Sequence, residues 1–131
     1  MPQWNCACDN CALARSGDGR VAPRTQDSLL VRAATGNLLV NASPDVLRQI
    51  EATPALQPAA RRGTGISAIV LTNGDLDHVL GLFSLRESQR LVVYATERVW
   101  TGITANAMAR TLMRFDGHVT HRRLSIGEPM R

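Results

Sequence analysis

An apolar run that ends in a short acidic loop most strongly limits what this chain can fold into. Residues 66–71 read I-S-A-I-V-L, and T-N-G-D-L-D-H follows directly at residues 72–78. The run predicts a buried strand, and the apolar positions after His78 predict a helix that packs inward. Carboxylate, amide and imidazole groups at the end of a buried strand are a common arrangement for binding a metal ion. The sequence therefore predicts strand and helix layers with a metal-binding loop between them.

The segment before this unit predicts a hairpin followed by a helix. Residues 28–33 and 38–40 are expected to form two antiparallel strands, with the turn at Gly36-Asn37. Ser43 is a natural N-cap for a helix that extends to about residue 52. The chain is therefore expected to return to the sheet from a helix before the acidic loop begins.

The segment after the loop repeats the alternation of strands and helices. Residues 91–94 predict a strand, Thr96 is a candidate N-cap for the next helix, and residues 119–124 predict an edge strand. Strands that alternate with helices indicate the α/β class, here as an α+β sandwich of a sheet with helices packed on it.

Length and composition suit one domain. A chain of 131 residues with 44% hydrophobic residues can form a core, so residues 1–131 are expected to be a single domain. No long apolar run or charged leader is visible, so no membrane span is expected and the predicted location is cytoplasmic. All 15 basic residues are arginines scattered along the chain, so the net charge of +4 does not predict nucleic-acid binding.

The three cysteines lie together in a Cys-rich segment, residues 1–15. Cys6, Cys8 and Cys11 form a C-x-C-x-x-C pattern, which is a poor disulfide framework and a good partial site for a structural zinc ion. The alternative is three reduced cysteines without a role, but thiols this close together would be prone to oxidation. Three residues are candidates for the fourth ligand, and the sequence does not select among them: Asp9, His118 and His121.

Six segments along the chain together carry a resemblance to one known family. They are P-Q-W-N-C-A-C-D-N-C-A (2–12), P-R-T-Q-D-S (23–28), L-V-N-A-S-P-D (39–45), I-E-A-T-P-A-L (50–56), L-T-N-G-D-L-D-H-V-L-G-L (71–82) and S-L-R-E (84–87). In this order they resemble the pyrroloquinoline quinone (PQQ) synthesis protein B family of the metallo-β-lactamase superfamily, which implies part of a metallo-β-lactamase-like αββα fold. Family members have an additional first strand and continue further, so residues 1–131 are expected to be an incomplete, N-terminal portion of the domain.

The acidic loop departs from the motif of the superfamily, which usually reads H-x-H-x-D-H and binds two metals for hydrolysis. Asn73 and Asp75 occupy the first two histidine positions, while Asp77 and His78 keep the last pair. The resemblance implies that Asp75, Asp77 and His78 hold one ion, iron or another divalent metal, with Asp77 and His78 as the catalytic pair. It also implies that Asn73 and Asn41, which stands where the superfamily often has aspartate, orient these ligands.

A simpler interpretation of the loop requires no metal. Asp77 and His78 then stabilise the start of a helix, where an aspartate is favourable by itself. Asp75 would be an ordinary solvated loop residue.

The resemblance also implies a function in PQQ biosynthesis. The expected activity is a metal-dependent oxygenase that hydroxylates a tyrosine-derived PQQ precursor, a small molecule or a dipeptide derivative. The alternatives are transport of PQQ or its precursor toward the periplasm, hydrolysis of a phosphodiester, and an inactive truncated fragment. A sheet without its first strand has an exposed edge, so association as a homodimer or with a complementary chain is expected.

Overall fold

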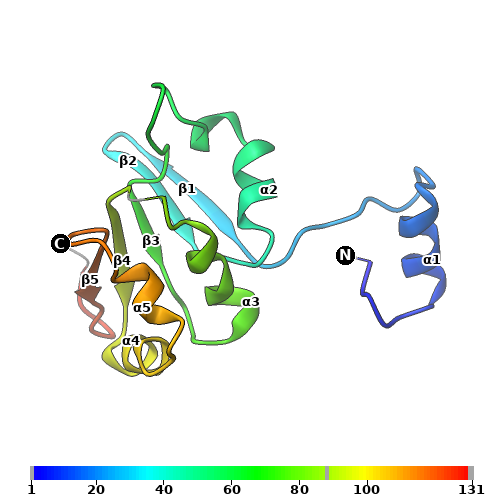
Figure 1. The fold of residues 1–131 in the computed structure, drawn as a ribbon. Coiled ribbons are helices and arrows are strands. Elements are labelled where there is room, and N and C mark those ends of the chain that lie inside the picture. The colour runs from blue at the N-terminus through cyan, green and yellow to red at the C-terminus, as the bar shows by residue number, and fades with distance from the viewer. Residues whose placement is uncertain (1, 88, 130–131) are drawn as a thin grey trace.

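The computed structural model describes residues 2–87 and 89–129, and five strands form one sheet in the order β1-β2-β3-β4-β5 (Figure 1). β1 (Leu29–Ala33) is antiparallel to β2 (Gly36–Val40). β3 (Ala68–Val70), β4 (Leu91–Ala95) and β5 (Val119–Arg123) each run parallel to the strand before them. The carboxyl ends of the four parallel strands therefore meet at one edge of the sheet, where the loops after β2, β3 and β4 begin.

The helical segments pack against one face of this sheet and form the core with it. Leu39, Ile69 and Val93 are fully buried neighbours on three adjacent strands, and their cluster includes residues of every helical segment of the body. These segments are α2 (Val46–Glu51), η1 (Pro54–Leu56), α3 (Leu76–Val79), η2 (Leu80–Ser84), α4 (Glu97–Thr104) and α5 (Ala109–Leu112).

The opposite face of the sheet is apolar over β1 to β4, and it is open. The cross-strand register places two rows of side chains there, and Leu29 and Val31 at the edge are 61% and 42% exposed. The structure thus has one helix layer and one sheet layer, which confirms the predicted α/β class and corresponds to part of an αββα sandwich. The rows are Leu29, Val40, Val70, Tyr94, and Val31, Leu38, Ala68, Val92.

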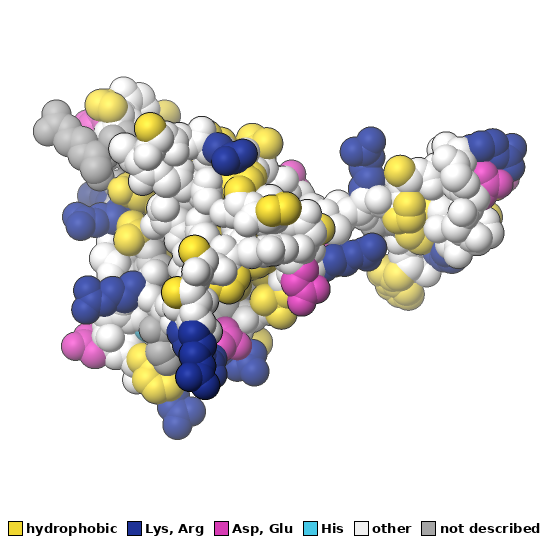
Figure 2. All heavy atoms as spheres, turned by 90° about the horizontal axis from the view of Figure 1, so that it is seen from above, with side chains coloured by type: hydrophobic (Ala, Val, Ile, Leu, Met, Phe, Trp, Pro, Cys, Tyr) yellow, Lys and Arg dark blue, Asp and Glu magenta, His cyan; other side chains and the backbone are white. Residues whose placement is uncertain are grey.

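The cysteine segment lies apart from this body. Its helix α1 (Asp9–Ser16) is joined to β1 by an extended connection (Figure 1). Figure 2 shows the same projection from above, linked to the body by a narrow neck. Among the described residues, no helix is long and apolar enough to cross a membrane.

Two local predictions before the acidic loop are wrong. The hairpin turn lies at Ala34-Thr35, because Ala33 pairs with Gly36, which opens β2 with a φ of 137°. Ser43 does not cap α2; its hydroxyl donates to Gln49 Oε1 at 3.1 Å, and the helix begins only at Val46. Local propensity does not decide either role: Gly36 belongs to the ladder of the hairpin, and Gln49 engages the Ser43 hydroxyl.

The elements after the loop follow the predictions more closely. Thr96 caps α4, since its hydroxyl accepts a hydrogen bond from the Val99 N–H at 3.4 Å. The helix predicted after His78 begins earlier, at Leu76, and continues from Leu80 as a 3-10 turn. In this 3-10 turn Gly81 lies against the backbone of the residues that follow β2. A Cβ on Gly81 would lie 2.1 Å from the Ser43 carbonyl oxygen, so the close approach requires glycine.

Candidate metal centre

The acidic loop leaves β3 and turns directly into α3. Leu71 is buried and its N–H donates to the Tyr94 carbonyl at 2.8 Å, which extends the pairing of β3 with β4 by one residue. Asn73 Oδ1 then accepts the Asp75 N–H at 2.9 Å, a local turn that directs the chain into the helix. Asp75 is the N-cap of α3 but makes no side-chain capping bond, so its carboxylate remains available to a ligand.

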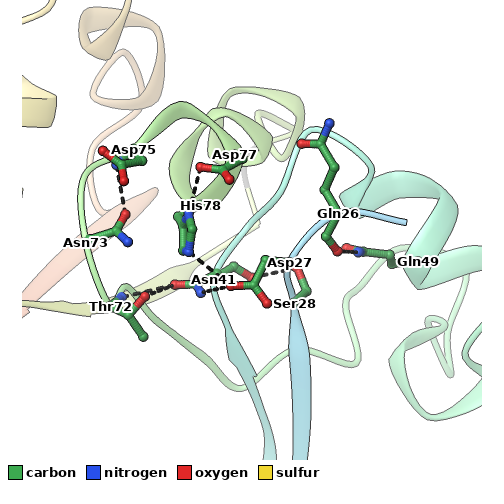
Figure 3. Close-up of polar contacts among 10 residues, drawn as sticks. All are labelled: Gln26, Asp27, Ser28, Asn41, Gln49, Thr72, Asn73, Asp75, Asp77 and His78. Atoms are coloured by element: carbon green, nitrogen blue, oxygen red, sulfur yellow. Dashed lines mark hydrogen bonds and ion pairs between the residues drawn. The ribbon is translucent and has the colours of Figure 1, made fainter. Parts of the chain in front are cut away.

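The loop brings the three predicted metal ligands together. One donor atom each from Asp75, Asp77 and His78 lies within 4.8 Å of the other two, and His78 Nδ1 is 2.8 Å from Asp77 Oδ1 (Figure 3). Both carboxylates are exposed, whereas the His78 side chain is only 15% exposed. Two carboxylates and an imidazole at such separations suit one divalent ion with open coordination positions. These residues therefore fit the predicted metal.

Asp27 also belongs to this centre, although the sequence pattern did not predict it. Its Oδ2 lies 3.0 Å from His78 Nε2, so the imidazole stands between the carboxylates of Asp27 and Asp77 (Figure 3). When Nε2–H donates to Asp27, the Nδ1 lone pair faces the Asp75 and Asp77 side, where a metal would bind. The only sequence signal for Asp27 was its position in the P-R-T-Q-D-S segment.

The neighbouring carboxylates perturb the titration of His78. Its pKa is raised above the usual value, chiefly by the hydrogen bond with Asp77, while partial burial acts in the opposite direction. The negative charges of Asp77, Asp27 and Asp75 raise the pKa further. The three carboxylates thus favour the protonated imidazole, and a metal ion that bound Nδ1 would compete with a proton there.

Asn41 connects the end of β2 to the loop and to Asp27. Its backbone has a φ of 62° and its side chain is buried. Asn41 Oδ1 accepts hydrogen bonds from the N–H and the hydroxyl of Thr72, both at 3.0 Å, and Nδ2 donates to Asp27 Oδ2 at 3.3 Å. The Asn41 side chain thus hydrogen-bonds Thr72 and Asp27 and none of the three ligands, and Asp27 links it to His78.

The three thiols form a second candidate centre on the projecting segment. The sulfur atoms of Cys6, Cys8 and Cys11 lie within 4.8 Å of one another, and no disulfide joins them. The Arg15 guanidinium donates to the carbonyls of Cys6 and Gln3, which folds the segment back over the start of α1. Three converging sulfurs fit a tetrahedral zinc ion with one further position.

Hydrogen bonds to Cys8 favour its thiolate. The pKa of the Cys8 thiol is lowered, first by a hydrogen bond from the backbone of Cys11 and then by contacts with the thiols of Cys6 and Cys11. A thiolate is the form that binds zinc, so Cys8 is the sulfur most ready to act as a ligand.

None of the three candidate fourth ligands joins the thiols. Among the described residues, the cluster within 4.8 Å contains the cysteines alone. His118 is only 2% exposed, before β5, and His121 stacks on Trp100 at 4.6 Å and contacts the Ala95 carbonyl oxygen through Nε2. Both histidines belong to the sheet body, away from the projecting segment.

Comparison with known proteins agrees with this fold. Residues 36–131 match the model of the Beta-lactamase superfamily domain. The chain therefore belongs to the beta-lactamase superfamily.

Within that superfamily, the chain is similar to coenzyme PQQ synthesis protein B, which confirms the resemblance seen in the sequence. The protein of Methylobacterium sp. (strain 4-46) is 48% identical over 130 residues, which are 98% of this chain and 43% of that protein. The protein of Methylobacterium nodulans is 54% identical over 108 residues, which are 81% of this chain and 36% of that protein. The chain thus spans less than half the length of these relatives.

The solved structures give the same result. Zn²⁺-bound PqqB from Methylobacterium extorquens superposes with a TM-score of 0.89 at 43% identity, covering 97% of this chain and 42% of that one. A diphosphatase of the PhnP family has a TM-score of 0.68 at 22% identity, covering 95% of this chain and 46% of that one, which shows the shared fold alone.

Proposed function

We propose that this chain takes part in PQQ biosynthesis as the metal-binding portion of an oxygenase that hydroxylates a tyrosine-derived precursor. The observation that carries the proposal is the cluster of Asp75, Asp77 and His78, which offers one ion two carboxylates and an imidazole. Carboxylate and histidine ligands with open positions are the ligand types of non-haem iron oxygenases, whose usual set is two histidines and one carboxylate, and this cluster supplies one histidine and two carboxylates. The name of the similar PQQ synthesis proteins supports the pathway.

In this proposal the residues of the chain hold and orient the metal. Asp75, Asp77 and His78 Nδ1 are the ligands, and Asp27 keeps the Nε2 proton of His78 in place. An iron ion bound there supplies the redox chemistry that hydroxylation requires. The aryl C–H becomes C–OH with one atom of O₂, and the other oxygen leaves as water with two protons and two electrons from an added reductant.

A structural zinc ion at Cys6, Cys8 and Cys11 completes the proposal. The predicted structural role is supported by the position of these thiols on a separate segment held by Arg15. The solved structure of the similar PqqB from Methylobacterium extorquens is Zn²⁺-bound, which supports zinc as a metal for this chain.

Elemental analysis tests the two metal sites. Wild-type protein loaded with zinc and then with iron is expected to hold one zinc and one iron per chain. Cys8→Ser is expected to lose the zinc and keep the iron, and Asp77→Ala to lose the iron and keep the zinc. Equal loss of both metals in either variant contradicts two independent sites.

The activity is tested with a tyrosine-containing dipeptide, oxygen and ascorbate. Mass spectrometry is expected to detect a product heavier by one oxygen atom with the wild type and none with Asp77→Ala. An iron-loaded wild type that gives no such product refutes the oxygenase. Cleavage of a phosphodiester by the zinc- or manganese-loaded chain would instead favour the hydrolase alternative.

A further inference from the structure

A cavity of about 500 Å³ lies beside the acidic loop, between the loop with α3 and helix α4. Its floor is apolar and mostly buried, because Val79 and Ile103 are 4% and 6% exposed members of the core. Polar groups stand at the rim, and the Asp75 carboxylate joins the cavity to the metal centre. The residues that matter here are Val79, Phe83 and Ile103 on the floor, and Asp75, Arg98 and Asn106 at the rim.

Two glycines keep the cavity open. Gly74 on the loop and Gly102 on α4 both line it, and a Cβ at either position would meet no atom within 4 Å. Gly102 lies inside a helix, where glycine costs about 0.5–1 kcal/mol relative to alanine. A larger side chain at Gly102 would therefore enter free space at the cavity without disturbing the backbone.

Arg98 gives the rim one cationic group that an anionic ligand could contact. Asp75 and Arg98 are the charged residues that line the cavity. Asp75 belongs to the metal cluster, and Arg98 forms no ion pair within the described part of the chain. Asn106 Oδ1 accepts the Met108 N–H at 2.9 Å, so its amide NH₂ remains to donate. A guanidinium and an amide donor over an apolar floor suit a carboxylate carried on an apolar body.

We propose that this cavity binds the organic substrate, and that the substrate is a carboxylate on an apolar or aromatic body. The carboxylate contacts Arg98, the body packs on Val79 and Ile103, and the far end points to the metal centre at Asp75. This assignment rests on the proposed function, because it places the organic substrate next to the metal ligands.

Calorimetric titration of the zinc-loaded chain with 3-phenylpropionate and its uncharged amide tests the cavity without any turnover. The wild type is expected to bind the carboxylate about tenfold more tightly than the amide, as a charge-assisted hydrogen bond predicts. Arg98→Gln is expected to lose this preference and still bind the amide. Gly102→Leu is expected to lose both ligands.

Matched variants control for general effects. Arg110→Gln removes an exposed arginine of α5 that does not line the cavity, and Gly102→Ala adds only one methyl group to α4. Both are expected to bind 3-phenylpropionate as the wild type does, and circular dichroism checks that every variant is folded.

The proposal is overturned if the wild type binds neither compound, or if Arg98→Gln and Arg110→Gln weaken binding equally. Binding as predicted by a chain that makes no hydroxylated product would refute the oxygenase and leave the cavity assignment standing. If the wild type makes the hydroxylated product but Gly102→Leu binds 3-phenylpropionate with full affinity, the cavity assignment is refuted and the oxygenase stands.

Discussion

Replacement of Asn41 by aspartate is expected to destabilise the metal-free protein. The Asn41 amide donates to Asp27 Oδ2 at 3.3 Å, so Asn41→Asp puts two carboxylates at that distance. Two unit charges 3.3 Å apart repel by about 5 kcal/mol at an effective dielectric constant of 20. The Asp27 side chain is 64% exposed, and solvent screening reduces the repulsion to about 1–2 kcal/mol. Loss of the donated hydrogen bond adds about 1 kcal/mol.

Urea unfolding followed by tryptophan fluorescence measures this cost. At pH 7 in a chelating buffer, Asn41→Asp is expected to lower the free energy of unfolding by about 2–3 kcal/mol. The cost is expected to shrink toward pH 4, as carboxylates become protonated. Both hydrogen bonds from Thr72 to position 41 are retained, since aspartate also presents an acceptor oxygen there.

A double-mutant cycle with Asp27→Asn isolates the interaction. The new asparagine donates to the new aspartate, so the double variant is expected to be more stable than the sum of the two single changes predicts. Asp27→Asn alone is the control for the lost ion pair with His78. Strictly additive effects, or an Asn41→Asp protein as stable as the wild type at pH 7, would refute the reasoning.

Three further outcomes are expected. Because the pKa of His78 is raised, its contribution to stability is fully present below about pH 6.5 and is lost as the pH rises through the folded-state pKa. Urea midpoints across pH should show this loss in the metal-free wild type and a smaller loss in Asp77→Asn, which removes the largest cause and keeps the charges of Asp27 and Asp75. Neither ring nitrogen of His118 has a hydrogen-bond partner among the described residues, so His118→Leu is expected to raise the free energy of unfolding by about 1 kcal/mol without changing the metal content. The open sheet face is expected to drive association of the 131-residue chain in sedimentation velocity, and the double variant Leu29→Lys, Val31→Lys to reduce it; a monomeric wild type that melts cooperatively would contradict this.

The acidic loop shows which features of the structure the local sequence pattern can predict. Asp75, Asp77 and His78 lie within four consecutive positions, so a strand followed by a helix turn is enough to bring their side chains together. Cys6, Cys8 and Cys11 converge for the same reason, and Thr96 caps its helix as its position predicts. Such short-range geometry is fixed by backbone conformation, which the sequence pattern predicts well.

Contacts between distant segments were not predictable in this way. Ser43 is a good N-cap by type, but Gln49 engages its hydroxyl and Asp45 is occupied by the Gln26 N–H. His118 was a candidate ligand by type, and the structure buries it away from the thiols. The Gln26 N–H, 19 residues away, decides the role of Asp45, and burial in the sheet body decides that of His118.

The sequence by itself determined the loop, its missing histidines, the cysteine cluster and the alternation of strands and helices, because each depends on neighbours along the chain. Only the tertiary structure placed Asp27 against His78 and Arg98 across a cavity from Asp75. Those arrangements require the hairpin, the parallel strands and α4 to pack on one another. Packing follows from burial of the whole apolar face, and no single segment encodes it.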